Sequence, residues 1–279
     1  MQRLREHYGP WALITGASDG IGRAFAHELA AAGVHVVLVA RRGDVLEALA
    51  RELRTAHGVE VRVVAADLAQ ADGVARTVEA IADLDLGLFV AAAGYGTSGD
   101  FIGADLAVEL AMIDVNCRAV AALTQPIGRK LVERGRGGLV FMSSLVAFQG
   151  APRAANYAAT KAYIQTLAEG LAIELRGTGV DVLAVAPGPV QSGFASRADM
   201  KMSVTDSPAT VARGALHALG HRTTTRPGRW SKLLAWSLAT LPRWGRVQVM
   251  SKVMHGMTRH QQLPREGHPW ATHTLPPAP

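Results

Sequence analysis

The sequence predicts an α/β fold, a doubly wound parallel sheet, and three observations support this prediction. Short apolar runs alternate with helical stretches through residues 11–220. Glycine or polar residues follow most of the apolar runs, as they do at the ends of buried strands. The composition, 49% apolar and 19% charged, is that of a globular protein with a large core. We therefore expect a single domain over 1–220 that carries the site, with a C-terminal helical extension.

The first predicted strand, 11–15, runs into a glycine-rich turn and then a helix over 23–32. Glycines allow a tight turn and let backbone N–H groups at a helix N-terminus approach a pyrophosphate. The spacing here is Gly-x-x-x-Gly-x-Gly, which differs from the commoner Gly-x-Gly-x-x-Gly fingerprint. The turn predicts a nucleotide site made by Gly16, Ser18, Asp19, Gly20, Ile21 and Gly22.

The second strand, 34–40, ends in two arginines, Arg41 and Arg42. An acid at this point would bind the ribose 2′-hydroxyl of NAD(H), whereas a cation suits a 2′-phosphate. The pair therefore favours NADP(H), although two solvated arginines at a strand end would give the same pattern.

The alternation continues with a helix over 44–56, a strand over 59–65, a helix over 71–82 and a strand over 86–92. Ligands in such sheets bind at the carboxyl ends of the strands. Asp67, Leu68, Ala93 and Gly94 follow two of these strands, and we place them at the adenine and the ribose. Asp67 could equally cap the helix that follows it.

A helix over 106–133 contains Asn116 among apolar neighbours, where an amide needs partners. Asn116 is therefore either a structural hydrogen-bonding group or part of the site. The neighbouring Cys117, the only cysteine, is expected to be a small buried side chain in a reduced, cytoplasmic protein. No metal site is expected. The fifth strand, 138–142, delivers Ser143 and Ser144 to the same edge of the sheet.

Tyr157 and Lys161 lie four residues apart on a predicted helix from Pro152 to about residue 176. Side chains at this spacing share a helix face, and a nearby ammonium lowers the pKa of a phenol. The pair predicts a tyrosine that exchanges protons, although tyrosine and lysine also occur together on solvated helix faces. A sixth strand, 181–186, ends in Pro187-Gly188-Pro189.

Taken together, these motifs resemble the short-chain dehydrogenase/reductase family over residues 11–220. The residues that carry the resemblance are Gly16, Gly20, Gly22, Asn116, Ser144, Tyr157, Lys161 and Pro187-Gly188. The resemblance implies a Rossmann fold and an active enzyme. It also selects Ser144 over Ser143, because the family's serine lies thirteen positions before the tyrosine.

The roles that the resemblance implies can be assigned one residue at a time. Ser144 would polarise a substrate carbonyl, and Tyr157 would donate a proton as hydride arrives. Lys161 would lower the tyrosine pKa and hold the nicotinamide ribose, and Asn116 would anchor a water. The family's Pro-Gly-x-x-x-Thr contact to the carboxamide matches residues 187–192 with serine in place of threonine, so the implied cofactor residues there are Pro187, Gly188, Val190 and Ser192.

One departure from the family stands at Ala91-Ala92-Ala93-Gly94, where relatives usually have Asn-Asn-Ala-Gly, so an amide that braces the sheet is missing. The opening 8–22 and the stretch 233–260 look most like the very-long-chain 3-oxoacyl-CoA reductase and hydroxysteroid dehydrogenase branch. We therefore expect NADPH-dependent reduction of a lipid-like ketone, a 3-oxoacyl thioester or a steroid. The alternative is an idle NADP-binding sensor or scaffold at a membrane surface.

Residues 189–207 are expected to form a mobile substrate flap that ends where Ser207-Pro208 begins a helix. Phe194, Met200 and Met202 could line an apolar pocket or simply pack. The cations Arg197 and Lys201 could meet the phosphates of a CoA-type substrate or remain solvated.

The C-terminal part is strongly basic, since residues 221–279 hold nine Lys or Arg and one acid, Glu266. Two apolar series at helical spacing predict a basic amphipathic extension over 221–262: Trp230, Leu233, Leu234, Ser237, Leu238 and Leu241, then Val247, Met250, Val253, Met254 and Met257. Such a lid could touch anionic lipid, cover the substrate pocket or dock on a partner subunit. The proline-rich 263–279 is expected to be disordered.

The remaining expectations concern partners. No nucleic-acid motif accompanies the basic residues, and no apolar run reaches the length of a signal or membrane span, so peripheral membrane contact through 230–260 is the only membrane contact we expect. A homodimer or homotetramer through helices 106–134 and 152–176 is implied by resemblance.

Overall fold

The computed structural model describes residues 2–202, 204–228, 231–232, 237–238 and 240–261. Its centre is a seven-stranded sheet in the order β3-β2-β1-β4-β5-β6-β7, in which every pair of neighbours is parallel. The strands are β1 (Trp11–Thr15), β2 (His35–Ala40), β3 (Val61–Ala65), β4 (Leu86–Ala91), β5 (Gly137–Met142), β6 (Val180–Val185) and β7 (Thr224–Thr225). The predicted doubly wound fold is confirmed.

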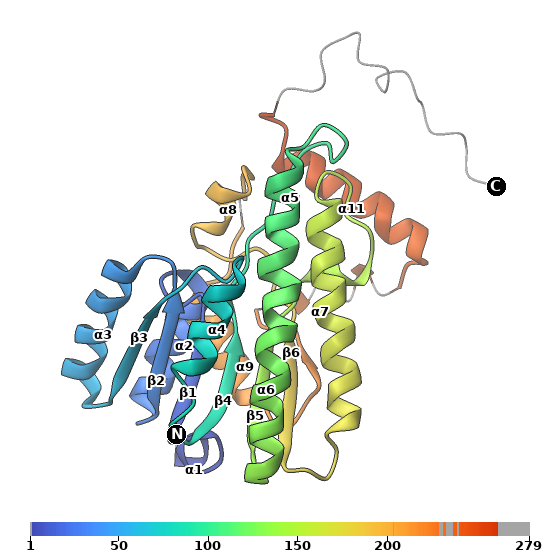
Figure 1. The fold of residues 1–279 in the computed structure, drawn as a ribbon. Coiled ribbons are helices and arrows are strands. Elements are labelled where there is room, and N and C mark those ends of the chain that lie inside the picture. The colour runs from blue at the N-terminus through green and yellow to red at the C-terminus, as the bar shows by residue number, and fades with distance from the viewer. Residues whose placement is uncertain (1, 203, 229–230, 233–236, 239, 262–279) are drawn as a thin grey trace.

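Helices cover both faces of the sheet (Figure 1). One face packs against α1 (Gln2–Tyr8), α2 (Gly20–Ala31), α3 (Gly43–His57) and α9 (Pro208–Ala218). The other packs against α4 (Ala71–Glu79), α6 (Ala119–Arg134) and α7 (Ala155–Glu174). The central strands β4 and β5 are buried along their whole length, as expected for strands covered on both faces.

The predicted helix over 106–133 is not one regular helix. It consists of α5 (Leu106–Ile113), a π-helical turn η1 (Asp114–Arg118) and α6. The Ala119 N–H bonds to the Asp114 carbonyl, five residues back, and Asn116 lies within this turn. Single π-turns often occur at functional sites, because they change the direction in which a side chain points.

The structure also differs from the predicted elements in the start of one helix and in two elements that were not predicted. Helix α2 starts at Gly20, earlier than predicted, because the Asp19 carboxylate caps it by accepting from the Gly20 N–H at 2.7 Å. The helix α1 was not predicted. Strand β7 lies beyond residue 220, so the sheet continues past the predicted end of the domain.

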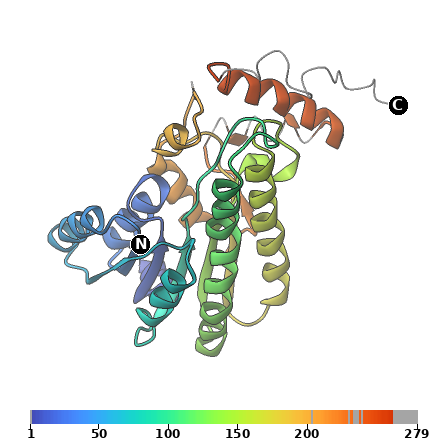
Figure 2. The ribbon, with the colours of Figure 1, turned by 45° about the horizontal axis from the view of Figure 1, so that its top comes forward.

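The second apolar series of the C-terminal extension forms α11 (Arg243–Met257). Figure 2 shows this helix lying across the ends of α5 and α7, above the carboxyl edge of the sheet. Of the first series, Trp230, Leu233 and Leu234 lie outside the described residues, as does the whole of 263–279. Among the residues that are described, no helix is long and apolar enough to cross a membrane.

Candidate active site

The glycine loop leaves no room for side chains at two of its positions. A Cβ on Gly22 would lie 2.3 Å from the Gly16 carbonyl oxygen. Gly16 itself has a φ of +70°, and a Cβ there would lie 2.8 Å from the backbone of Ala92 and Ala93. The loop therefore presents bare backbone at the N-terminus of α2, which is the cradle that a pyrophosphate requires.

The same loop is joined to the start of the flap. The second carboxylate oxygen of Asp19 accepts from the Gly193 N–H at 3.0 Å. A Cβ on Gly20 would lie 2.9 Å from the Cβ of Ser192. Asp19 thus caps a helix and fixes the segment that follows β6, a double role that its place in the sequence did not indicate.

Arg41 and Arg42 are exposed at the carboxyl end of β2, beside the glycine loop. The Arg42 guanidinium lies 3.2 Å from the Ser18 hydroxyl, so it contacts the loop while it remains exposed to solvent. The structure does not support Asp67 as the cap of the next helix. Its carboxylate accepts from the Ala69 N–H at 3.0 Å, but the N-cap position of α4 is Gln70.

A hydroxyl braces the sheet near the position of the missing amide. Thr15 is buried at the end of β1, and its Oγ1 accepts from the Ala93 N–H at 3.1 Å. This bond holds the end of β4, and with it Gly94, against β1. Sequence reasoning missed Thr15 because its partner lies 78 residues away.

Asn116 is buried and uses both ends of its amide. Its oxygen accepts from the Tyr95 N–H, and its nitrogen donates to the Tyr95 carbonyl and to the Thr160 hydroxyl, at 2.9 to 3.1 Å. A Cβ on Gly94 would lie 2.9 Å from that amide oxygen. Asn116 therefore joins the residue after Gly94 to α7, which is the structural role that the sequence allowed for it. Its part in a proton relay stays a prediction.

Tyr157 and Lys161 share one face of α7, as their spacing predicted. The Lys161 Nζ lies 5.7 Å from the centroid of the Tyr157 ring. Burial raises the pKa of Tyr157 to about 12, and a hydrogen bond with the Ser144 side chain opposes this rise only in part. The expected lowering of the tyrosine pKa by Lys161 is therefore wrong for this arrangement. Tyr157 is held as a protonated phenol, able to donate.

Lys161 lies deep in the site, at 6% exposure, and donates to the Met142 carbonyl at 2.8 Å. Burial lowers its pKa to about 8.

The neighbouring Cys117 is partly exposed rather than fully buried. Partial burial still raises the pKa of its thiol to about 11, which leaves the thiol protonated and inert at neutral pH.

A pocket opens where these groups meet the flap and α11. It is lined by predicted site residues: Ile21, Gly94, Ser144, Tyr157, Lys161, Pro187, Gly188, Val190 and Ser192. Its apolar lining includes Phe194 and six of the eight methionines: Met142, Met200, Met202, Met250, Met254 and Met257. The apolar face of α11 thus covers this pocket, which is one of the alternatives for the C-terminal extension.

Other contributors had no signal in the sequence. Ser231 accepts from the Gly188 N–H at 2.9 Å and donates to Asp206, and so fixes the Pro-Gly turn from more than 40 residues away. Arg197 lies 3.9 Å above the Tyr95 ring. The sequence analysis had considered only a contact with a substrate phosphate or a solvated position for this arginine. Lys201 is exposed.

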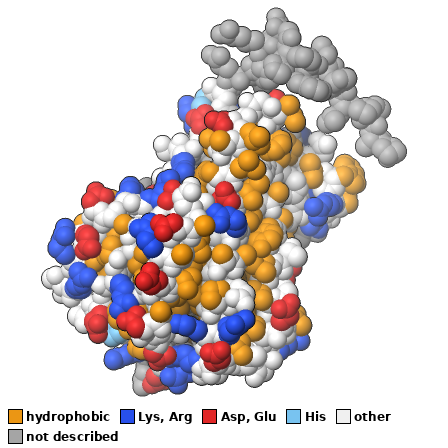
Figure 3. All heavy atoms as spheres, in the orientation of Figure 1, with side chains coloured by type: hydrophobic (Ala, Val, Ile, Leu, Met, Phe, Trp, Pro, Cys, Tyr) orange, Lys and Arg blue, Asp and Glu red, His pale blue; other side chains and the backbone are white. Residues whose placement is uncertain are grey.

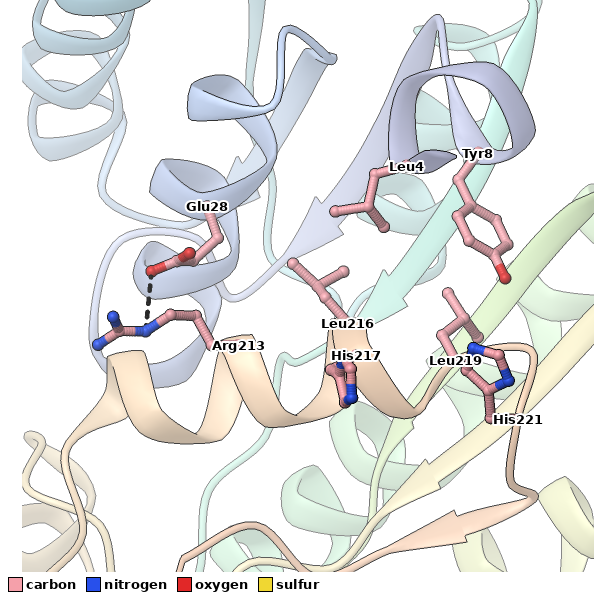
Figure 4. Close-up of a pocket in the computed structure, with 8 residues that line it drawn as sticks. All are labelled: Leu4, Tyr8, Glu28, Arg213, Leu216, His217, Leu219 and His221. Carbon is pink, nitrogen blue, oxygen red and sulfur yellow. Dashed lines mark ion pairs between the residues drawn. The ribbon is translucent and has the colours of Figure 1, made fainter. Parts of the chain in front are cut away.

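A second cavity, of about 300 Å³, lies near the opposite edge of the sheet, between α1, α2 and α9 (Figure 4). Leu4, Tyr8 and Leu216 form its apolar part, and an ion pair between Glu28 and Arg213 lies at one end. None of the predicted site residues lines it. The chemistry that the sequence indicates therefore belongs to the methionine-lined pocket.

Comparison with known proteins places the chain among relatives. Residues 10–202 match the family model for short chain dehydrogenase. The chain is 34% identical over 239 residues to a 7β-hydroxysteroid dehydrogenase of Collinsella aerofaciens, covering 82% of this chain and 90% of that protein. It is 29% identical over 258 residues to the human very-long-chain 3-oxoacyl-CoA reductase, covering 90% and 82%.

Among solved structures, a short-chain dehydrogenase from Sphingobium yanoikuyae in complex with NADPH superposes with a TM-score of 0.74. It is 30% identical, and the match covers 83% of this chain and 95% of that one. The family model, the relatives and the fold all agree. The chain therefore belongs to the short-chain dehydrogenase/reductase family of oxidoreductases.

Proposed function

We propose that this protein is an NADPH-dependent reductase of a bulky, lipid-like ketone. The observation that carries the proposal is the arrangement of Tyr157, Ser144 and Lys161 at the inner end of an apolar pocket, where burial raises the pKa of the tyrosine. Bound NADPH would supply the hydride. Tyr157 would give its proton to the carbonyl oxygen, which Ser144 would also hydrogen-bond. Lys161 would stabilise the phenolate that remains.

The residues around the glycine loop fit NADP(H). The bare backbone at Gly16 and Gly22 suits a pyrophosphate, and Arg41 and Arg42 offer two cations at the end of β2 for a 2′-phosphate. The NADPH-bound relative from Sphingobium yanoikuyae supports the same choice.

The apolar wall supports a hydrophobic substrate. Methionine side chains are flexible and polarisable, so a wall built from them adapts to several shapes. Steroids and long-chain 3-oxoacyl thioesters both suit it, as the names of the relatives suggest. Single-turnover oxidation of NADPH with a panel of steroid ketones, 3-oxoacyl thioesters and quinones tests the proposal. Tight NADPH binding without turnover of any of them would favour the rival, an idle NADP-binding sensor.

We also propose that the protein pairs through α5, α6 and α7. Exposed apolar side chains gather over these helices (Figure 3). They include Leu106, Leu110 and Ile113 on α5, Val132 on α6, and Tyr163 and Ile173 on α7. Changing Leu106 and Leu110 to glutamate should turn an oligomer into a monomer in sedimentation, while Val204→Glu, at an exposed apolar residue of the flap, should not.

The outer face of α11 supports a further part of the proposal, peripheral contact with anionic lipid. No acid occurs between Arg243 and Gln261, while Arg243, Lys252 and Arg259 are exposed and Trp244 is 71% exposed. Tryptophan with basic residues is typical of helices at a headgroup surface. Co-sedimentation with vesicles that contain phosphatidylglycerol should fall for Arg243→Glu with Lys252→Glu and persist for Arg51→Glu on α3. Binding that survives the double change would rule this contact out.

A further inference from the structure

The cavity around Tyr157 is small. Its volume is about 170 Å³, below the roughly 300–1,000 Å³ of pockets that hold drug-sized ligands. Side chains of the flap and of α11 line it: Phe194, Met200, Met202, Met250, Met254 and Met257. A bulky ketone therefore fits only if these segments shift, and whatever holds them sets the room in the pocket.

The end of α11 is held by a group of hydrogen bonds that we call the clasp, made by Arg153, Thr258, Gln261, Ser98 and Asp199. The Arg153 guanidinium donates to the Thr258 hydroxyl at 2.6 Å and to the Gln261 side-chain oxygen at 2.5 Å. The Gln261 side-chain nitrogen donates to the Ser98 hydroxyl at 2.7 Å and to the Asp199 carbonyl at 2.9 Å. One glutamine thus joins three separate segments.

Further bonds in the clasp attach the flap itself. The Lys201 N–H donates to the carbonyl of Met257, the last residue of α11, at 2.8 Å. His260 lies 2.8 Å from the Asp199 carboxylate, and Ser98 donates to the Ala198 carbonyl at 2.6 Å. The end of α11 therefore contacts the flap through backbone and side chains at once.

Arg153 links the clasp to the catalytic helix. It stands four residues before Tyr157, just ahead of α7, and its carbonyl accepts from the Gly99 N–H at 2.9 Å. Among the described non-glycine residues, only Arg153, with a φ of +65°, and Asp199, with a φ of +49°, adopt a left-handed backbone. Residues hold such conformations where the surrounding structure requires them, and both occur in the clasp.

We infer that Arg153 is a positioning residue, which fixes α11 over the pocket so that the methionine wall presses a bulky ketone toward Tyr157. Its guanidinium holds Thr258 and Gln261, and through Gln261 it holds the flap. Loss of these bonds frees the end of α11 without touching Ser144, Tyr157 or Lys161. The inference rests on the proposed function for its kinetic part only.

Arg153→Asn tests it, because asparagine tolerates a left-handed backbone but cannot reach the clasp. Amide hydrogen exchange across residues 243–261 should quicken about tenfold or more, as expected for loss of a charge-assisted hydrogen bond, while β4 and β5 stay protected. KM for a bulky ketone should rise by a similar factor, while kcat for a small ketone changes less than about twofold. Arg51→Asn, an exposed arginine on α3, is the matched control.

A second set of variants separates the guanidinium from the backbone. Arg153→Gly, which removes the side chain and accepts the positive φ, should behave as Arg153→Asn does. Gln261→Ala should give the same exchange signature, and the double variant Arg153→Asn with Gln261→Ala should add little to either single change. Unchanged exchange in 243–261 in both single variants would overturn the inference. If the variants exchange faster over 243–261 but the wild-type protein reduces no ketone, the structural role of the clasp is supported and only the proposed reductase function is contradicted.

Discussion

The cofactor side and the substrate side of this molecule are held in shape by different means. At the glycine loop, backbone packs on backbone: a Cβ on Gly22 would meet the Gly16 carbonyl, six residues away. At the substrate side, side chains join distant segments, and Arg153 reaches Gln261 across 108 residues. The loop's own packing is close and local, although Asp19 also joins it to Gly193, whereas the second arrangement consists of hydrogen bonds that can open. The difference suits the proposed reductase, in which NADP(H) binds in one fixed pose while the pocket adapts to a bulky ketone.

The largest effect should come from the residue where the two sides meet. Tyr157→Phe should lower kcat by about 10²-fold or more, because general acid catalysis is typically worth that much, while NADPH affinity stays within about threefold because the ring remains. Stopped-flow NADPH oxidation and fluorescence titration measure the two quantities. Tyr163→Phe, on the exposed face of the same helix, is the control. Turnover near the wild-type value would remove Tyr157 from the mechanism.

The rigidity of the cofactor side can be broken at Gly22. Gly22→Ala should lower the free energy of unfolding by about 3 kcal/mol and abolish cofactor binding, because the new methyl would lie 2.3 Å from backbone that cannot move aside. Urea unfolding gives the first value. Gly128→Ala on α6, where nothing lies within 4 Å, should be neutral or stabilising. Equal stabilities for the two variants would mean that the loop is softer than its geometry indicates.

The choice between NADPH and NADH tests a different property of the cofactor side, because it depends on the exposed charge of Arg41 rather than on backbone packing. Arg41→Asp should weaken NADPH binding by about tenfold or more relative to NADH, the loss expected for a charge-assisted bond to phosphate replaced by repulsion. The ratio of the two dissociation constants is the measurement, and the melting temperature should hardly change. If both cofactors lose affinity equally, Arg41 does not recognise the 2′-phosphate.

The smallest effect concerns pH. Burial lowers the pKa of Lys161 from 10.5 to about 8, so between these values the unfolded chain binds more protons than the folded one. Stability should therefore rise between pH 8 and pH 9, by about 1 kcal/mol. Cys117, whose pKa burial raises from 9.0 to about 11, opposes this rise above pH 9, and Tyr157, with a pKa of about 12, opposes it above pH 10. Urea unfolding of wild type and Lys161→Met across this range should show the slope in the wild type alone; equal slopes would assign it to other groups.

Distance along the chain, rather than the side of the molecule, decided what the sequence could and could not predict. The order of strands and helices, the glycine loop and the Tyr157–Lys161 face depend on residues a few positions apart, and the structure contains all three. The brace at Thr15 and the turn support from Ser231 depend on partners 78 and 43 residues away. The raised pKa of Tyr157 was missed for a related reason: burial is a property of the folded whole, and the spacing to Lys161 carries no measure of it.

The π-turn at Asp114–Arg118 has a consequence for insertions and deletions. Because a π-turn fits one extra residue into a single helical turn, deleting one residue from it would give a regular α-helix and leave the direction of α5 against α6 nearly unchanged. Leu106 and Leu110 would keep their direction, whereas Asn116 would leave the position from which it reaches Tyr95 and Thr160. The π-turn therefore sets where Asn116 points without altering the surface proposed for pairing.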